Sequence, residues 1–203
     1  ARARNRARAA QLLSAAVALA ISIPAGSMIG LAGTAPGSLD KTFSKEDLRE
    51  DLRVLWAVLD EGHGGFDRYV PRDDQKKNFD AVEAGLTGPL SEIDFYRRLL
   101  PLIAGIKDGH TGLLLSAGTR AELLARPVLF PFELRFLGGK TYLFRNLSGA
   151  REIRDGTEIL EINGTPMSEI RQKLQLLIPA AANTVSRRLR LLENPNTFGT
   201  NFA

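Results

Sequence analysis

The spacing of apolar residues changes at about Arg126, and this change limits the possible folds more than any other feature of the chain. Before it, apolar residues recur every three or four positions, which is typical of helices packed on a core. After it, short apolar runs are separated by glycine-containing turns, which is typical of strands. The pattern predicts an α+β fold, with a helical module over residues 39–126 and a smaller module over residues 127–180.

The helical half carries signals for the ends of its helices. Three pairs fit the capping pattern S/T-x-x-D/E, in which a hydroxyl and a carboxylate satisfy the free amides of a first turn: Ser44 with Asp47, Ser91 with Asp94, and Thr119 with Glu122. The apolar spacing predicts helices from Ser44 to Gly62, from Pro71 to Gly88 and from Ile93 to Lys107, with Asp108–Gly109 as the final stop.

The second half contains three strand candidates, at residues 127–136, 140–146 and 157–163. Asn163–Gly164 predicts a tight turn, and a helix should follow Pro166. Residues 181–203 are expected to be a linker, with one short helix at 187–192 and a loop-like end.

The N-terminus has the order of a secretory signal peptide. An arginine-rich start (1–8) precedes the apolar run "LLSAAVALAISI" (12–23), and Pro24 and small residues follow. A retained membrane anchor is the alternative, but a spanning helix needs about 20 apolar residues. We therefore expect residues 1–38 to be signal peptide and linker, and the protein to be exported to the periplasm, cell envelope or medium, with no stable membrane insertion after cleavage.

Charge and cysteine content exclude several classes of protein. Arg2, Arg4, Arg6 and Arg8 account for the whole net charge of +4. The rest of the chain therefore lacks the basic excess of a nucleic-acid-binding surface, and the cluster at 187–190 is interpreted as a solvated helix face. The absence of cysteine excludes disulfides, a thiol nucleophile and Cys-based zinc sites.

The stretch "KDGHTGLLL" (107–115) contains His110, one of two histidines in the chain. Imidazole has a pKa near neutrality and is the usual proton acceptor for a hydroxyl nucleophile. Asp108 is a possible orienting carboxylate for the ring. The structural alternative is that His110 only caps the preceding helix, since the helix dipole favours a positive charge there.

Other candidate residues are interpreted as structural. His63, in the glycine-rich loop "EGHGGFDRY" (61–69), is expected to pack the loop, and no third ligand accompanies the two histidines. The sequence therefore predicts no metal and no cofactor. No G-x-S-x-G motif occurs. Ser38, in an S-x-x-K match, lies beside the signal segment, and Ser116 lacks a glycine-rich context, so no catalytic serine is expected in this chain.

The stretch "GTEILEINGTPMSEIRQKL" (156–174) combines a turn, a strand, Asn-Gly and an amphipathic helix. Such a unit can leave a groove to which an extended peptide adds by backbone hydrogen bonds. A plain module that only closes a core fits the same pattern, and the residues alone do not separate the two.

Together, three stretches resemble the C-terminal-processing (tail-specific) serine peptidase family, in the branch related to the tricorn protease core and the interphotoreceptor retinoid-binding modules. They are "DLRVLWAVLDEGHGGFDRY" (51–69), "DFYRRLLPLIAGIKDGHTGLLL" (94–115) and "IRDGTEILEINGTPMSEIRQKL" (153–174). The resemblance covers about residues 44–203. It implies a helical cap domain (39–126), a PDZ-like segment (127–180) and a linker (181–203) towards a catalytic α/β domain that this chain is expected to lack.

In this branch the histidine of the D-G-H-T element is the general base for a serine on the later domain, and that role falls on His110. Members with a Ser–Lys dyad do not need this histidine. The resemblance implies the N-terminal part of an exported serine-type endopeptidase whose substrate is an unfolded or C-terminally exposed polypeptide. A non-catalytic ligand- or peptide-binding envelope protein of the same fold is the alternative.

Overall fold

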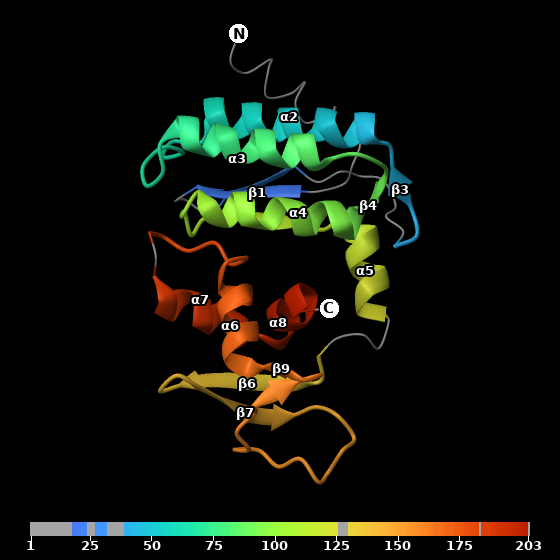
Figure 1. Ribbon diagram of the computed structural model, residues 1–203, viewed down its shortest axis with the longest axis vertical. Helices are drawn as coiled ribbons and strands as arrows, with labels where there is room; N and C mark the ends of the chain where they lie inside the picture. Colours follow the sequence, from blue (N-terminus) through green and yellow to red (C-terminus); the bar gives the residue numbers. More distant parts are fainter. Residues whose placement is uncertain (1–17, 24–26, 32–38, 126–129, 183, 203) are drawn as a thin grey trace.

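The computed structural model describes residues 18–23, 27–31, 39–125, 130–182 and 184–202, the first two ranges by their backbone only. The described residues form helices and small antiparallel sheets, so the predicted α+β class is confirmed. The core consists of two separate hydrophobic clusters, and the helices that carry them lie one above the other in Figure 1. The change of pattern at Arg126 lies outside the described residues.

Three helices surround the first cluster: α2 (Lys45–Gly62), α3 (Arg72–Gly85) and α4 (Glu92–Gly105). The leucines that predicted the first helix are buried, from Leu48 to Leu59. Strands β3 (Thr42–Phe43) and β4 (Leu90–Ser91) pair directly before α2 and α4. This pairing joins the starts of the two helices, so α2 and α4 run in the same direction and end close together.

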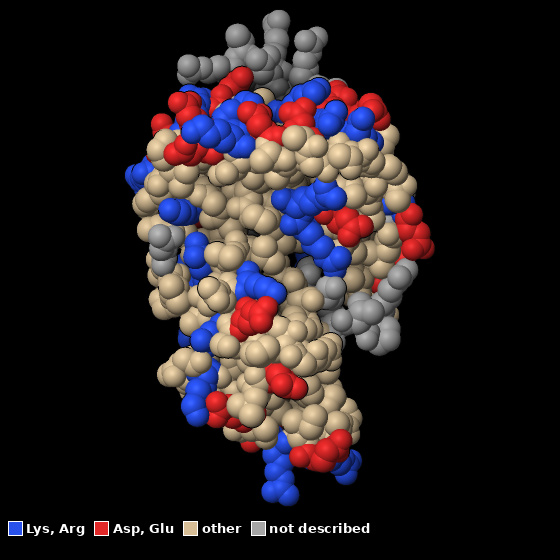
Figure 2. Space-filling model, in the orientation of Figure 1, with Lys and Arg blue, Asp and Glu red and all other residues tan. Residues whose placement is uncertain are grey.

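The outer surface of α2 and α3 carries mixed charge (Figure 2). Arg53 Nη2 lies 2.6 Å from Glu83 Oε1 and links α2 to α3. On α3, Lys77 Nζ lies 2.8 Å from Asp74 Oδ1. Exposed pairs of this kind contribute little to stability because water screens them, so this face is a solvated one.

Two of the three capping predictions are confirmed. Ser44 Oγ accepts from the Asp47 amide at 3.2 Å, and Ser91 Oγ accepts from the Asp94 amide at 3.1 Å. The third prediction, a cap at Thr119, was wrong. The cap lies three residues earlier, where Ser116 Oγ accepts from the Thr119 amide at 3.2 Å at the start of helix α5 (Ala117–Ala125). The reason is that the Thr119 hydroxyl donates to the buried carboxylate of Glu92 instead of capping a helix.

Helix α4 does not end on Asp108–Gly109 as predicted. It ends at Gly105, and Lys107 adopts the left-handed conformation with φ of 60° that glycine usually supplies after a helix. The Lys107 amide donates to the Ala104 carbonyl at 3.1 Å, which closes the last turn. Asp108, Gly109 and His110 then lead into strand β5 (Thr111–Leu114).

Part of the predicted signal segment is extended in the structure. Strand β1 (Ala18–Ile23) pairs antiparallel with β2 (Ser27–Leu31) on one side and with β5 on the other. Residues 12–17 of the apolar run lie outside the described residues. Among the residues that the structure does describe, no helix is both long and apolar enough to span a bilayer.

The second cluster packs against one side of a hairpin formed by β6 (Phe132–Leu137) and β7 (Lys140–Asn146). Strands β8 (Glu161–Ile162) and β9 (Thr165–Pro166) form a second hairpin, and helix α6 (Met167–Gln175) follows. The predicted Asn163–Gly164 turn is confirmed, since φ is 51° and 77° at its two residues. A bridge between Tyr142 and Glu158 connects the two hairpins.

The short helix expected at residues 187–192 is confirmed, whereas the end of the chain, expected to be loop-like, is helical as well. The two helices are α7 (Val185–Leu192) and α8 (Pro195–Phe202). Leu192 and Phe198 are 0% and 1% exposed and belong to the second cluster. The Asn-Pro pair suggested a loop, but Asn194 Oδ1 caps α8 by accepting from the Asn196 amide at 3.0 Å, and Pro195 suits a first helical position.

Candidate active site

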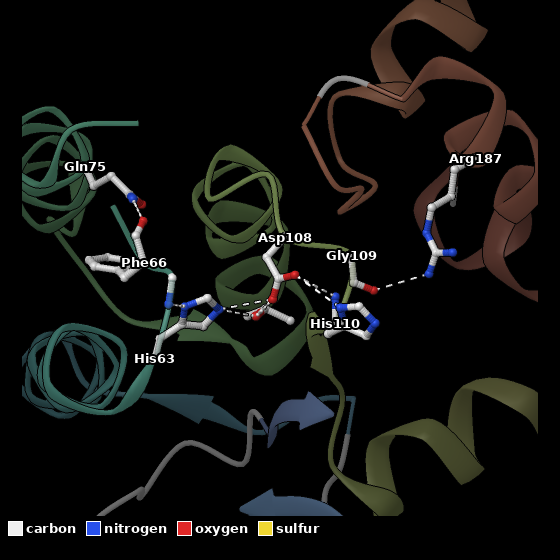
Figure 3. A network of polar contacts seen from close by, with 9 residues as sticks. His63, Phe66, Gln75, Asp108, Gly109, His110 and Arg187 are labelled. Carbon is white, nitrogen blue, oxygen red and sulfur yellow. Dashed lines mark hydrogen bonds and ion pairs between the residues drawn. The ribbon is translucent and has the colours of Figure 1, made fainter. Parts of the chain in front are cut away.

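The candidate site lies where α2 and α4 end (Figure 3). His63 follows the last turn of α2. Asp108 and His110 come from the turn between α4 and β5, and Thr111 is the first residue of β5. The common direction of the two helices brings these segments together, although His63 and Asp108 are 45 residues apart in the sequence.

Asp108 is the centre of the polar network. Its Oδ2 accepts a hydrogen bond from Thr111 Oγ1 at 2.7 Å and lies 3.1 Å from His63 Nε2. Its Oδ1 accepts from the His110 amide at 3.2 Å and lies 3.4 Å from His110 Nδ1. Partial burial opposes ionisation of the carboxyl group, but the hydrogen bonds from Thr111, His110 and His63 outweigh it and lower the pKa of Asp108. The group is therefore a carboxylate at neutral pH.

His63 is the buried histidine of the two, with 7% of its side chain exposed. Its Nδ1 accepts a hydrogen bond from the Gly65 amide at 3.2 Å, so the proton of the neutral ring is on Nε2. Nε2 lies 2.7 Å from Thr111 Oγ1, which in turn donates to Asp108. These contacts make His63 a donor that fixes Thr111 and Asp108, and leave it no free nitrogen with which to accept a proton.

Buried side chains hold the loop that carries His63 in place. Gln75, which is 3% exposed, donates through Nε2 to the carbonyls of Phe66 and Val70. The Phe66 ring meets Trp56 edge to face at 5.4 Å between centroids and the His63 ring at 6.2 Å. Buried contacts on both sides of the loop therefore set the position of His63.

His110 has the opposite environment, with 69% of its side chain exposed. Its Nδ1 faces the Asp108 carboxylate, which favours a proton on Nδ1 and leaves Nε2 as the lone-pair nitrogen. No residue in the described part of the chain lies within hydrogen-bond distance of that Nε2. This tautomer, with a lone pair on Nε2, is the one in which a histidine can accept a proton as a general base.

Comparisons with known proteins leave the family open. Neither the protein-family models nor the curated proteins gave a match.

Two serines were the other candidates in the sequence, and the structure describes one of them. The Ser116 hydroxyl is buried and donates to Glu92 Oε2 at 2.8 Å, which makes it a structural group. Ser38 lies outside the described residues. Within the described chain, no cluster of three or more His, Cys, Asp or Glu side chains is placed to hold a metal ion.

Sequence reasoning missed the part that His63 plays in the site. It also treated Arg187 as one of several solvated arginines, whereas Arg187 Nη2 donates to the Gly109 carbonyl at 3.3 Å. The available signal for His63 was its place in a glycine-rich loop, "EGHGGFDRY" (61–69), directly after a predicted helix. For Arg187 no sequence signal existed, because the contact depends on how the two halves of the molecule meet.

Proposed function

We propose that this chain is the N-terminal part of an exported serine-type endopeptidase that cleaves unfolded or C-terminally exposed polypeptides. The observation that carries the proposal is the Asp108–His110 pair, with Nδ1 of the exposed ring 3.4 Å from the carboxylate and Nε2 open to solvent. In the proposal, residues 39–126 are a helical cap domain, residues 127–180 are a PDZ-like segment, and the nucleophilic serine lies on a domain that follows this chain.

The proposed proton transfers use both sides of the His110 ring. Nε2 accepts the serine hydroxyl proton as the serine oxygen attacks the scissile carbonyl, and the resulting imidazolium is stabilised by the Asp108 carboxylate. The imidazolium then returns the proton to the departing amine, which leaves an acyl-enzyme that water hydrolyses. The lowered pKa of Asp108 supports this role, since the carboxylate stays charged while the ring is protonated.

A second candidate function is a non-catalytic ligand- or peptide-binding envelope protein. The exposure of His110 favours it, because no serine hydroxyl among the described residues lies near the ring. Leu174, on the apolar face of α6, is 5% exposed and belongs to the second cluster, so it does not line an open groove. A peptide would therefore have to bind elsewhere on the segment, for example along a strand edge.

The experiment that separates the two functions uses the full product of the gene that encodes this chain. Casein unfolded by reduction and alkylation is the substrate, and parent, His110→Ala and Arg190→Ala proteins are compared. The proposal predicts cleavage by the parent and by Arg190→Ala, and a loss of about 10²- to 10⁴-fold in His110→Ala. Cleavage unchanged by His110→Ala, or no cleavage by the parent, contradicts it. Residues 1–203 alone should show no cleavage.

A further inference from the structure

Residues just before α7 and in its first turn contact the turn that carries Asp108 and His110. The Ala182 amide donates to the Lys107 carbonyl at 2.9 Å. Arg187 Nη2 donates to the Gly109 carbonyl at 3.3 Å (Figure 3). Three residues, Ala181, Ala182 and Arg187, are here called the clasp. Two of them, Ala182 and Arg187, hold the carbonyls of Lys107 and Gly109, which lie on either side of Asp108. The clasp belongs to the second half of the molecule, whereas the turn belongs to the first.

Gly109 has no side chain because the clasp occupies that space. A Cβ atom there would lie 3.2 Å from Arg187 Nε and 3.3 Å from the Ala181 nitrogen. The φ angle of Gly109 is not in the left-handed region, so the turn itself does not require glycine. By contrast, a Cβ atom at Gly112 would meet nothing within 4 Å. Close approach by the clasp is therefore the physical reason for glycine at position 109.

The clasp is attached to the second cluster. The Thr184 hydroxyl donates to the Ala181 carbonyl at 2.7 Å and closes the turn before α7. Further along α7, Leu189 and Leu192 pack in the cluster that also contains Ile170 of α6. A shift of α6 would therefore move α7 and with it the guanidinium of Arg187.

We propose that Arg187 is a positioning residue for the Asp108–His110 pair, and that docking of the second half of the molecule sets the orientation of the His110 ring. The catalytic meaning of this inference rests on the proposed function, but the coupling itself does not. The clasp holds the carbonyls of Lys107 and Gly109, and this fixes the backbone on both sides of Asp108. The Asp108 carboxylate therefore keeps its hydrogen bond to the His110 amide. Without Arg187, the exposed ring is free to leave the carboxylate.

The histidine ring nitrogens provide a direct test in the full chain, because His63 and His110 are its only histidines. Ring-¹⁵N spectra of selectively labelled protein report the tautomer of each ring. We expect Arg187→Ala to lower the Nδ1-protonated fraction of His110 and to leave the His63 signals in place. Arg190→Ala, an exposed arginine on the same helix, is the matched control and should change neither ring.

A second pair of variants tests the same contact from the other side. Gly109→Ala should change the His110 signals as Arg187→Ala does, because its Cβ pushes the clasp away, whereas Gly112→Ala should not. Urea unfolding shows that each variant is folded. His110 signals in Arg187→Ala and Gly109→Ala that are identical to those of the parent would overturn the inference.

A kinetic readout separates this inference from the proposed function. In the full gene product, Arg187→Ala should lower kcat for casein by about 10- to 10²-fold, with a smaller change in KM. Parent-like kcat in Arg187→Ala, alongside loss of cleavage in His110→Ala, overturns the positioning role and leaves the proposed function intact. Altered His110 signals in a gene product that cleaves nothing support the coupling and remove the peptidase function.

Discussion

Nε2 of His63 lies 3.1 Å from Oδ2 of Asp108, and this contact joins the end of α2 to the end of α4. The same carboxylate faces His110 through its other oxygen. The two histidines therefore share one acid but differ in environment: the side chain of His63 is 7% exposed and that of His110 is 69% exposed. This difference separates the residue that holds the site from the residue that is free to react.

Substitution by alanine should cost much more stability at His63 than at His110. His63→Ala removes a buried donor, so the Gly65 amide loses its partner and Thr111 loses one of its two. The free energy of unfolding should therefore fall by about 1–3 kcal/mol. His110→Ala removes an exposed ring and should change it by no more than about 0.5 kcal/mol. Urea unfolding of both variants measures the difference. Equal losses of stability would mean that the assignment of buried and exposed roles is wrong.

Asp108 should contribute an acid-sensitive part of the stability. Because its pKa is lower in the folded chain than the ordinary value of 3.8, the unfolded state takes up a proton first as the pH falls. The stabilising effect is therefore complete above about pH 5 and is lost as the pH falls through the folded-state pKa. The unfolding free energy of the parent should decrease more steeply below about pH 4 than that of Asp108→Asn.

A surface carboxylate provides the control for this pH profile. Asp80→Asn removes an exposed charge that pairs with Lys76 on α3. Its pH profile should follow the parent more closely than that of Asp108→Asn does. If the Asp108→Asn profile instead coincided with the parent profile, the hydrogen bonds to the Asp108 carboxylate would not act as described.

Glu92, a buried acid at the start of α4, should be sensitive to substitution. It is 2% exposed and accepts from the Ser116 amide at 2.5 Å, from the Ser116 hydroxyl at 2.8 Å, and from the Thr119 hydroxyl. In Glu92→Gln an NH₂ group replaces one of the accepting oxygens and faces these donors. The free energy of unfolding should therefore fall by about 2–4 kcal/mol. Glu46→Gln, at an exposed position of α2, should cost less than about 0.5 kcal/mol. Thermal or urea unfolding gives both values.

Phe198 tests whether the end of the chain is part of the fold. Its ring is 1% exposed and lies 4.7 Å from that of Phe130 between centroids. Phe198→Ala should lower the free energy of unfolding by about 3–5 kcal/mol, whereas Val185→Ala, at a residue that is 53% exposed, should change it little. A neutral Phe198→Ala would support the interpretation of this segment as a linker.

The features that follow from local spacing could be predicted from the sequence. The leucines of α2 and the Asn163–Gly164 turn are examples, because helix periodicity and turn chemistry act over a few residues. The site could be predicted only in part. His110 and Asp108 are two residues apart and were recognised together, but the part played by His63 depends on the β3–β4 pairing that aligns α2 with α4.

Two errors have the same physical origin, which is a local signal overridden by burial. Thr119 matched a capping pattern, but its hydroxyl is used by Glu92, so Ser116 became the cap. The Asn194–Pro195 pair is typical of a turn, but here it starts a helix that places Phe198 in the second cluster. In both cases the contact that decides the outcome is with a residue distant in the sequence.

The central claim is that Nε2 of His110 accepts the proton of a serine hydroxyl. The most direct test is the rate at which a fluorophosphonate labels the full gene product, because this reagent reacts with an activated serine. We predict one labelled serine in the parent protein and a rate at least about 10²-fold lower in His110→Ala. An equal rate in the two proteins, or no labelled serine in the parent, would contradict the account.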